Sequence, residues 1–535
     1  MGREGGCCPA TAQPVLESGS SFLCKRGAAF QCSFTSPTQH IQHQTESCSD
    51  HPMSTSVKDF MTQDWIQEHT QGSSVVHGSS VVHGSLSEMD GNLLPKGQRL
   101  HICMVSDFFY PNMGGVEGHI YHLSQRLTRR GHRVIILTHA YGSRVGIRYL
   151  TSGVKVYYIP QWLVFDQVSL PTVYGFLPLF RYIVVREAID VVHGHQAFSC
   201  MCHEAILHAR TMGLRAVFTD HSLFGFEDTS SILTNKLLKF TLSDIDHVVC
   251  VSHTSKENTV LRASLNPVNV SVIPNAVVCA EFTPDPSRRD PSKITIVVTS
   301  RLVYRKGIDL LVTVIPIVCA EFDNVQFLIG GDGPKRIELE QMRERYVLQD
   351  RVQMLGAVNH SDIRNLLVQG HIFLNTSLTE AFCIAIVEAA SCGLLVVSTR
   401  VGGVPEVLPD DMVIFAHPDG NELVQAVRVA IDAIKHNRID SFSFHRRVSQ
   451  MYSWSNVAGR TEEVYKSVME VGEISLAERL QRYNGCGVFA GKLAAMIVAV
   501  NYLWWLFLEW LVPRECIDLA PLFDQEVFHE VGSFH

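Results

Sequence analysis

The fold of this chain is decided by the stretch Glu380-Ala-Phe-Cys-Ile-Ala-Ile-Val-Glu388, in which two carboxylates frame seven uncharged residues. Upstream, Ile372-Phe-Leu374 has the apolar character of a short buried strand. Downstream, Gly393 is placed as the C-terminal stop of a helix. Glu380 therefore lies near a helix N-terminus, and Glu388 about two turns further along on nearly the same face.

A helix N-terminus that follows a parallel strand is a place where α/β sheets bind ligands. Two carboxylates that face a cleft there would accept hydrogen bonds from sugar and ribose hydroxyls. The spacing alone leaves a plainer interpretation open, in which the helix dipole favours Glu380 and Glu388 faces solvent.

Apolar runs alternate with helical stretches on both sides of this motif, which predicts an α/β fold of two doubly wound, Rossmann-like domains with parallel sheets. Buried strands of the first domain are predicted at 101–106, 134–138, 154–159, 190–193, 216–219, 248–251 and 270–273. Those of the second domain are predicted at 294–299, 325–329, 352–355, 372–374, 395–398 and 413–416.

Changes in composition set the expected boundaries. Residues 1–97 are rich in Ser, Gly, His, Gln and Thr and contain the tandem repeat Gly72-Ser-Ser-Val-Val-His77 and Gly78-Ser-Ser-Val-Val-His83, so they are predicted to be a disordered, low-complexity extension. The rest divides into an acceptor-side domain (98–283), a proline-containing linker (284–292), a donor-nucleotide domain (293–450), a terminal helical and juxtamembrane segment (451–486), an apolar helix (487–512) and a short tail (513–535).

The bulk composition excludes several classes of protein. A net charge of −8 and a pI near 6.3 argue against a nucleic-acid binder. Fifteen cysteines without paired spacing fit reduced thiols in a cytosolic setting. The first thirty residues lack a continuous apolar core, so no signal peptide is expected.

The segment Gly487–Val512 has the length and aromatic content of one membrane span. A buried core helix is the alternative. Basic residues precede it at Arg479, Arg482 and Lys492, whereas Arg514 follows it beside acidic residues. The positive-inside rule then predicts cytoplasmic domains and a tail across the membrane.

Several strand ends carry groups suited to a nucleotide. Gly114-Gly115 follows the first strand and precedes a helix, so that backbone amides could approach a phosphate or sugar. An ordinary turn without a ligand would explain the two glycines equally well. Arg301 and Lys306 are two cations after a strand of the second domain, which suits a diphosphate leaving group, although a solvated basic turn has the same pattern. Gly331 lies in another strand–loop–helix junction, Gly330-Gly-Asp-Gly-Pro-Lys335.

Histidines end two strands of the first domain, in His193-Gly-His195 and Asp220-His221, where His195 and His221 could hydrogen-bond an acceptor hydroxyl or the donor sugar. Zinc is a weaker alternative, because Cys200, Cys202 and His203 follow with a spacing that matches no closed zinc site. Asp244-Ile-Asp246 resembles the Asp-x-Asp of metal-dependent sugar transferases but is interpreted as a helix-to-strand junction. No metal site is predicted.

Together these motifs resemble the retaining glycosyltransferases of the GT-B fold, family 4. Four strings are similar, more narrowly, to the family of phosphatidylinositol N-acetylglucosaminyltransferase catalytic subunits, often called PIG-A. The strings are Asp107-Phe-Phe-Tyr-Pro-Asn-Met-Gly-Gly-Val-Glu117, Phe218-Thr-Asp-His-Ser-Leu-Phe-Gly-Phe226, Ser300-Arg-Leu-Val-Tyr-Arg-Lys-Gly-Ile-Asp-Leu310 and Leu374-Asn-Thr-Ser-Leu-Thr-Glu-Ala-Phe-Cys383. The likeness covers roughly residues 100–512.

This resemblance implies transfer of N-acetylglucosamine from UDP-GlcNAc to phosphatidylinositol, the first step of GPI-anchor synthesis, on the cytoplasmic face of the endoplasmic reticulum. It implies retention without a metal or cofactor, and other subunits of a membrane complex as partners. The implied catalytic residues are Glu380, His195, Arg301 and Lys306. The implied donor-binding residues are Gly114, Gly115, Arg301, Lys306, Gly331, Glu380 and Glu388, and the acceptor side is His195 and His221.

Departures from the family pattern touch neither the pair Glu380 and Glu388 nor the pair Arg301 and Lys306. Val278 replaces an expected Asp, Cys200 and Cys202 replace small residues, and residues 1–97 have no counterpart. Two other functions stay open. One is another membrane-associated hexosyltransferase of the same fold, and the other is a catalytically silent scaffold subunit, against which the intact Arg301, Lys306, Glu380 and Glu388 argue.

Overall fold

The computed structural model describes residues 98–150, 152–165, 167–225 and 229–521. All of them belong to one unit of the chain, Ile66–His535. The extension predicted to be disordered, residues 1–97, and the end of the tail, residues 522–535, lie outside the described residues.

The first lobe is built on an eight-stranded sheet, and seven of its strands are the predicted apolar runs. β1 (His101–Val105) lies at its centre, and the strand order is β10-β9-β8-β7-β1-β2-β4-β3. All neighbours pair in parallel except β3 and β4. The other strands are β2 (Arg133–His139), β3 (Gly146–Tyr149), β4 (Lys155–Ile159), β7 (Val191–His195), β8 (Arg215–Asp220), β9 (His247–Cys250) and β10 (Val270–Val272).

Sequence patterns missed three short strands of this lobe. β3 lies at the sheet edge and mixes glycine, arginine and tyrosine with a single isoleucine, so it has no apolar run to reveal it. The small hairpin of β5 (Leu163–Phe165) and β6 (Val168–Ser169) is too short for any periodicity. The helices of this lobe are α3 (Gly115–Arg129), α4 (Leu177–Arg186), α5 (Cys200–Thr211), α6 (Thr229–Leu242) and α7 (His253–Ala263).

The second lobe has a six-stranded, wholly parallel sheet in the order β13-β12-β11-β14-β15-β16. This is the doubly wound order, in which the direction of winding reverses between β11 and β14. Its strands are β11 (Ile294–Thr299), β12 (Val325–Gly330), β13 (Val352–Gly356), β14 (Ile372–Asn375), β15 (Leu395–Thr399) and β16 (Val413–Ala416). Its helices are α8 (Ile308–Glu321), α9 (Arg336–Arg345), α10 (His360–Leu367), α11 (Ile384–Ser391), α12 (Gly420–Lys435) and α13 (Ser441–Met451).

Continuous apolar strands explain why both sheets are buried on two faces. Every residue of β15 and all but Thr299 of β11 are buried, and most of them are aliphatic, with helices on either side of the sheet. Short 3₁₀ helices join several elements: η2 (Pro267–Asn269), η3 (Cys279–Glu281), η4 (Pro286–Arg288), η5 (Tyr304–Lys306), η6 (Val404–Glu406) and η7 (Arg514–Cys516). The cysteines of the described residues are free thiols, as their spacing predicts.

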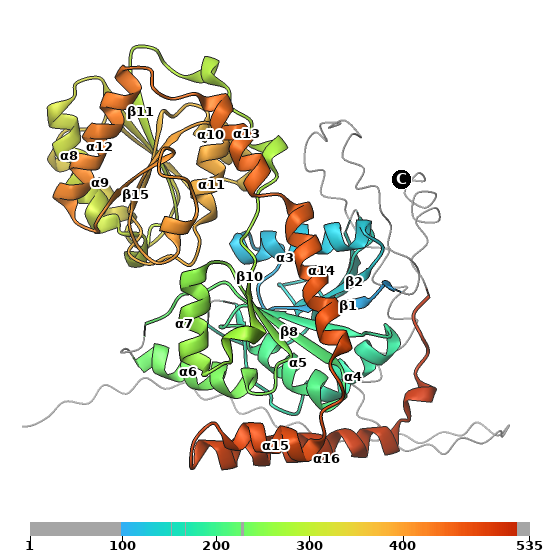
Figure 1. The fold of residues 1–535 in the computed structure, drawn as a ribbon. Coiled ribbons are helices and arrows are strands. Elements are labelled where there is room, and N and C mark those ends of the chain that lie inside the picture. Colours follow the sequence, from blue (N-terminus) through green and yellow to red (C-terminus); the bar gives the residue numbers. More distant parts are fainter. Residues whose placement is uncertain (1–97, 151, 166, 226–228, 522–535) are drawn as a thin grey trace, which may run out of the picture. The chain divides into compact units, whose positions relative to one another are not determined.

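Helix α14 (Trp454–Glu470) returns from the second lobe to the first and runs along it (Figure 1). Its Glu462 is buried, accepts a hydrogen bond from Arg130 Nη2 at 2.5 Å, and lies 2.8 Å from His132 Nε2. Its Tyr465 hydroxyl lies 2.7 Å from Nδ1 of His193 on β7. The segment that follows the second lobe in sequence is therefore part of the packing of the first lobe.

The chain then forms α15 (Leu476–Asn484) and α16 (Ala490–Leu511), which pack on one another. α16 covers nearly all of the predicted apolar segment 487–512. By length and composition it is the one helix of the described residues that could cross a membrane.

Candidate active site

A cleft of about 450 Å³ is lined by residues of both lobes. It lies where the loop after strand β1 of the first sheet meets the loop after strand β11 of the second sheet. In each sheet, the strand order reverses its direction next to that strand. Such reversal points are the ligand sites of doubly wound sheets.

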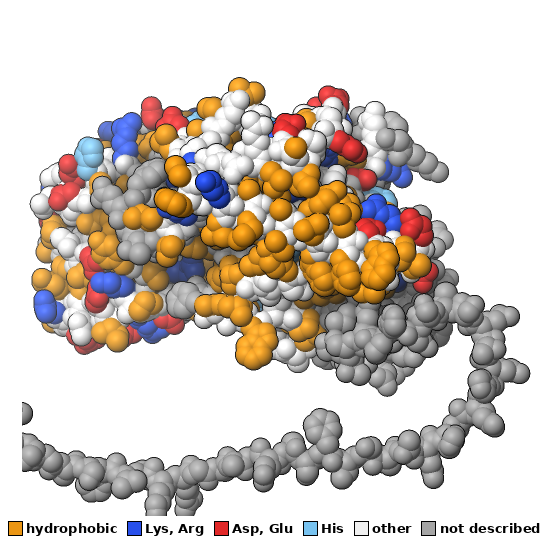
Figure 2. Space-filling model, turned by 90° about the horizontal axis from the view of Figure 1, so that it is seen from below, with side chains coloured by type: hydrophobic (Ala, Val, Ile, Leu, Met, Phe, Trp, Pro, Cys, Tyr) orange, Lys and Arg blue, Asp and Glu red, His pale blue; other side chains and the backbone are white. Residues whose placement is uncertain are grey.

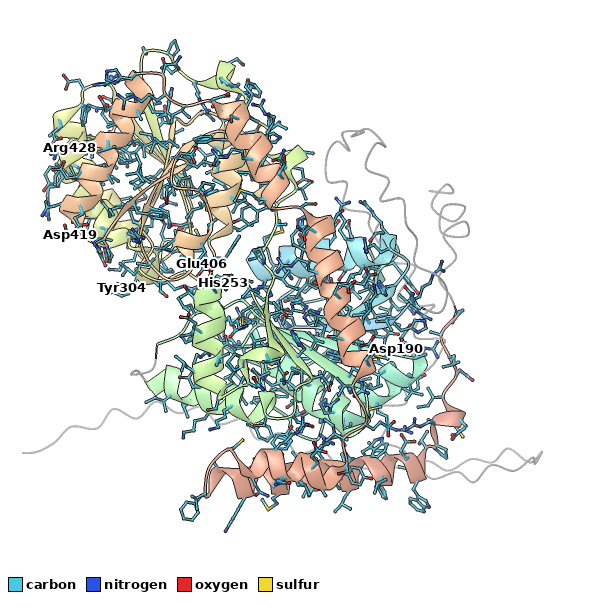
Figure 3. All side chains as sticks on the ribbon, viewed as in Figure 1. Asp190, His253, Tyr304, Glu406, Asp419 and Arg428 are labelled. Atoms are coloured by element: carbon cyan, nitrogen blue, oxygen red, sulfur yellow. The ribbon has the colours of Figure 1, made fainter. Side chains whose placement is uncertain are left out.

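Hydrogen bonds join the two lobes beside this cleft. The Glu406 carboxylate of η6 accepts from the backbone N–H groups of His253 (2.6 Å) and Thr254 (2.8 Å), and from the Thr254 hydroxyl. Glu406 thus caps the N-terminus of α7, and Figure 3 shows the two labelled residues, His253 and Glu406, next to one another. The cap fixes the second lobe against the first at one end of α7.

Glu388 lies on α11, lines the cleft and is buried. Burial raises the pKa of its carboxyl group to about 7, because the charged form is poorly solvated there. Within the described residues, no group hydrogen-bonds this carboxylate. A buried acceptor without a partner, aimed into a cleft, is suited to a ligand hydroxyl.

The two predicted cations differ in their surroundings. Arg301 follows β11, is exposed and lines the cleft, and no carboxylate of the described residues pairs with it. Lys306, at the end of η5, donates instead to Glu380, which also accepts from the Ser377 hydroxyl at 2.8 Å. The site therefore holds one free cation in the cleft and a lysine–glutamate pair, as far as the described residues show.

The Lys306–Glu380 pair is held by the backbone around it. Thr376 donates from its hydroxyl to the Lys306 carbonyl, 2.9 Å away. Gly403 donates its N–H to the Glu380 carbonyl at 3.0 Å. A Cβ on Gly402, whose φ is +52°, would lie 2.1 Å from that same carbonyl oxygen, so this close approach requires glycine. The turn at Gly402-Gly403 thus positions Glu380.

Glu380 differs from the prediction in one respect. It precedes the N-terminus of α11 by four residues, and Cys383, which caps that helix, has a φ of +68°. The sharp turn at Cys383 directs the loop away from the helix axis. Glu380 therefore pairs with Lys306 and does not line the cleft with Glu388.

Glycines bring backbone close to the cleft on both lobes. Gly114 and Gly115 begin α3 and line the cleft, where a helix N-terminus favours an anion. Gly331 lines the opposite wall. Its φ is +144°, and a Cβ there would lie 1.8 Å from the Ser300 carbonyl oxygen, so no other residue fits.

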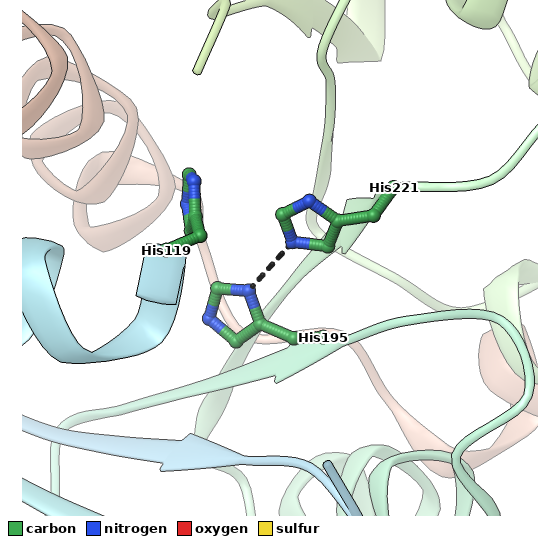
Figure 4. A group of neighbouring side chains, drawn as sticks. All are labelled: His119, His195 and His221. Atoms are coloured by element: carbon green, nitrogen blue, oxygen red, sulfur yellow. Dashed lines mark hydrogen bonds between the residues drawn. The ribbon is translucent and has the colours of Figure 1, made fainter. Parts of the chain in front are cut away.

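Three histidines of the first lobe form a cluster beside the cleft (Figure 4). His195 Nδ1 lies 3.3 Å from His221 Nε2, and His119 Nδ1 lies 2.8 Å from the Asn275 amide oxygen. Burial lowers the pKa of all three imidazoles, that of His119 to about 4, so they are neutral near pH 7.

Only His119 of this cluster lines the cleft; His195 and His221 lie behind it. The other ring nitrogen of His195, Nε2, lies 3.4 Å from the Met104 sulfur. The three histidines are the one described group that could hold a metal ion, since their ligand atoms lie within 4.8 Å of one another. Ligation would require His195 to give up its contacts with His221 or Met104.

The structure therefore brings together in one cleft five of the predicted site residues: Gly114, Gly115, Arg301, Gly331 and Glu388. Lys306, Glu380, His195 and His221 lie outside its lining. Sequence reasoning missed His119, His122 and Trp454, which also line the cleft. His119 follows Gly115 by one helical turn, which was an available signal, whereas Trp454 reaches the cleft only because α14 crosses between the lobes.

The two alternative metal motifs have structural roles. Cys200, Cys202 and His203 belong to α5. Asp246 accepts from Arg210 Nη1 at 2.6 Å, and Asp244 accepts from Arg479 Nε at 2.5 Å. The Asp-x-Asp motif is thus a junction between α6 and β9 whose carboxylates are paired with arginines.

Family models match two parts of the chain: PIGA (GPI anchor biosynthesis) matches residues 139–228, and Glycosyl transferases group 1 matches residues 280–440. The chain is 59% identical over 423 residues to a phosphatidylinositol N-acetylglucosaminyltransferase subunit of Arabidopsis thaliana, covering 79% of this chain and 94% of the relative. It is 58% identical over 433 residues to a Homo sapiens subunit of the same transferase, covering 80% and 89%.

Solved structures share the fold at low identity. Sucrose-phosphate synthase of Thermosynechococcus elongatus superposes with a TM-score of 0.58 at 20% identity, over 69% of this chain and 99% of that protein. Anabaena Alr3699/HepE, solved in complex with UDP, superposes with a TM-score of 0.56 at 18% identity, over 69% and 100%. These likenesses show the two-lobed glycosyltransferase architecture.

Proposed function

Because this chain belongs to the PIG-A family of phosphatidylinositol N-acetylglucosaminyltransferase subunits, we propose that it transfers N-acetylglucosamine from UDP-GlcNAc to phosphatidylinositol with retention of configuration. The chain is a glycosyltransferase of GPI-anchor biosynthesis. The donor, the lipid acceptor and the stereochemical course are the proposal.

One observation carries the proposal: a free cation, a buried carboxylate and two glycine turns share a single cleft within the described part of the chain. The Glu388 carboxylate would accept hydrogen bonds from the ribose hydroxyls of the donor. Arg301 and the N-terminus of α3 would face the diphosphate between them, and Gly331 would let the backbone approach the nucleotide closely. A volume of about 450 Å³ is in the range of cofactor-sized sites.

The chemical step needs stabilisation of the leaving group. When the bond between the anomeric carbon and the diphosphate oxygen breaks, negative charge grows on the diphosphate beside Arg301. Lys306 pairs with Glu380 outside the cleft lining, so it would have to turn toward the diphosphate to join Arg301. An ammonium has three donors and could keep Glu380 while it binds a phosphate oxygen. The inositol oxygen then bonds to the same face of the anomeric carbon, and its proton passes to the departing diphosphate.

The neutral histidines would position the sugar. His119 lines the cleft, and its ring is fixed by Asn275, so that its other nitrogen can hydrogen-bond a donor hydroxyl. His195 and His221 pack behind it and would act through it. We propose that the reaction uses no metal or other cofactor, because the free Arg301 lines the cleft and could neutralise charge on the diphosphate.

The site of action would be the cytoplasmic face of the endoplasmic reticulum membrane. The relatives are named as subunits, which implies further subunits of a transferase complex as partners. α16 is the apolar segment that would attach this protein to the membrane. The lipid acceptor would then lie in the membrane to which the protein is attached.

The proposal is tested by supplying this chain to microsomes that lack their endogenous form of it. Labelled N-acetylglucosamine from UDP-GlcNAc should appear in phosphatidylinositol. Arg301→Ala should lower kcat by about 10²-fold, because a charged donor to the leaving group is lost, and Arg301→Lys should restore part of it. Arg438→Ala, an exposed arginine of the same lobe, should transfer at the normal rate.

The same assay separates the alternatives. Transfer that Arg301→Ala leaves unchanged would mean that this chain is a scaffold and that a different component of the complex catalyses. Transfer of a different hexose, with none from UDP-GlcNAc, would place the chain among other hexosyltransferases of this fold.

A further inference from the structure

A groove of about 400 Å³ lies on the side of the first lobe that carries α15 and α16. Helix α6 forms one wall of this groove, and the first two turns of α16 form another. Its lining residues and those of the cleft between the lobes do not overlap. Figure 2 views the molecule from this side and shows hydrophobic side chains gathered there, with basic side chains among them. The groove is therefore a second concave site, apart from the candidate active site.

The wall contributed by α16 is apolar. Its lining residues are Ala490, Leu493, Ala494 and Ile497, and their spacing of three and four residues places them on one face of the helix. At a rise of about 1.5 Å per residue, this face extends for about 10 Å along the groove. The ring of Phe240 on α6 continues the apolar surface. A surface of this kind favours contact with an alkyl chain.

The wall contributed by α6 carries positive charge. Lys236 is exposed, Lys239 is half-buried, and both line the groove. The described lining contains no carboxylate that could neutralise them. Lysines three residues apart on a helix repel one another, and a bound anion would relieve that repulsion. The charge of this wall therefore favours an anionic ligand.

A buried guanidinium group points to the same kind of ligand. Arg262, near the end of α7, is only 5% exposed and lines the groove. Its Nε donates to the Asn235 amide oxygen at 2.6 Å, and its Nη1 donates to Asp220 at 3.3 Å. Its Nη2 is buried and has no hydrogen-bond partner within the described residues. A buried donor without an acceptor is costly, so we expect a ligand to supply an oxygen atom there.

The turn between α15 and α16 is fixed to α6 beside these groups. Cys486 Sγ lies 3.0 Å from the Ser243 hydroxyl, and the rings of Tyr483 and Phe240 are 5.3 Å apart. These contacts hold the start of α16 near the lysines of α6. If α16 crosses the membrane, as its length and composition allow, its basic end at Lys492 lies level with the cytoplasmic headgroups.

We propose that this groove binds one anionic glycerophospholipid of the membrane that α16 enters. The lipid phosphate lies between Lys236, Lys239 and Arg262, and one acyl chain lies along the apolar wall of α16. Basic pockets beside membrane helices on the cytoplasmic side bind acidic headgroups in this way. The bound lipid holds the first lobe at the leaflet and is separate from the acceptor that reacts in the cleft. This inference does not rest on the identity of the donor or the acceptor.

The test is native mass spectrometry of the full chain in a neutral detergent, with dioleoyl phosphatidylserine or dioleoyl phosphatidylcholine as the probe. One phosphatidylserine should be retained at a concentration about tenfold lower than phosphatidylcholine requires, because only the serine lipid has a net negative charge. Lys236→Glu with Lys239→Glu should raise the phosphatidylserine concentration for half occupancy by more than about tenfold, since two charge-assisted contacts are lost. The same reversal at Lys293 and Lys435, exposed lysines outside the groove, should leave this concentration unchanged.

A second variant tests the buried guanidinium group. Arg262→Lys keeps a positive charge beside Asp220 but removes the free N–H, so it should weaken retention by about tenfold. Equal retention of the two lipids, or retention that both groove variants leave unchanged, would overturn the proposal. Complete displacement of phosphatidylserine by millimolar inorganic phosphate would also overturn it, because the site would then hold a soluble anion. Transfer activity plays no part in this measurement, so its failure and failure of the proposed transfer reaction are told apart.

Discussion

Substitution of Glu388 by glutamine should remove a pH dependence from donor use. In the structure, burial raises the pKa of this carboxyl group to about 7. Ribose hydroxyls donate hydrogen bonds to the ionised form, so bound donor favours ionisation and binds the protonated form less well. Donor affinity should therefore rise as the pH rises through 7.

The magnitude follows from the ionised fraction of Glu388. With a pKa of about 7, this fraction is about 0.9 at pH 8, about 0.5 at pH 7 and about 0.1 at pH 6. The kcat/KM for UDP-GlcNAc should thus fall about tenfold from pH 8 to pH 6. Glu388→Gln has no titrating group, and the loss of hydrogen bonds to a charged acceptor should lower its kcat/KM by roughly 10- to 100-fold at pH 8.

The assay is the initial rate of transfer by the complete complex in microsomes, measured against donor concentration between pH 5.5 and 8.5. Because kcat/KM reports groups of the free enzyme, it is the proper observable. Glu344→Gln makes the same replacement on the surface of the same lobe. It controls for effects on the rate that do not depend on the cleft. The reasoning is refuted if Glu388→Gln keeps the pH profile of the unmodified protein, or keeps its kcat/KM at pH 8.

Three further predictions concern stability and local geometry. Glu388 should also affect the free energy of unfolding. Its raised pKa gives a stabilisation of about 3 kcal/mol that is full below about pH 4.5 and is lost as the pH rises through 7. The difference in Tm between Glu388→Gln and the unmodified protein should therefore be more favourable to the variant at pH 8 than at pH 5. Glu462→Gln breaks the buried pair with Arg130 and should cost about 3 kcal/mol, seen as a Tm several degrees lower, while Glu463→Gln, its exposed neighbour, should leave Tm unchanged. Gly331→Ala should lower transfer more than tenfold, because its Cβ would collide with the backbone beside Arg301; Gly459→Ala, with open space around its Cβ, should be neutral, and equal activity of the two variants would contradict this account.

The sequence predicted the strands of both sheets well where each is a continuous apolar run. Ile294–Thr299 and Leu395–Thr399 are examples, because a strand covered by helices on both faces needs apolar side chains at nearly every position. It also placed Arg301 just after one strand and Glu388 on the helix that follows another, since ligand groups in such sheets follow the carboxyl ends of strands. The edge strand Gly146–Tyr149 has no such requirement and escaped prediction.

Other features depended on contacts between residues far apart in the chain. Glu380 faces Lys306 because a left-handed turn at Cys383 redirects the loop, and spacing along an ideal helix cannot anticipate that turn. His119 of α3 lines the cleft and lies against His195 of β7, with ring centroids 5.6 Å apart, whereas His195 does not line the cleft. Neither contact can be predicted from the spacing of apolar residues along the chain.

By itself, the sequence determined the order of strands and helices, the family and the chemical types of the residues at the strand ends, because these follow from local apolar patterns and motifs. The tertiary structure alone decided which of those residues share the cleft, that α14 packs back on the first lobe, and that the start of α16 lies beside α6. The physical reason is that pairing, burial and pKa depend on neighbours brought together by folding, such as Arg130 and Glu462, which are 332 positions apart.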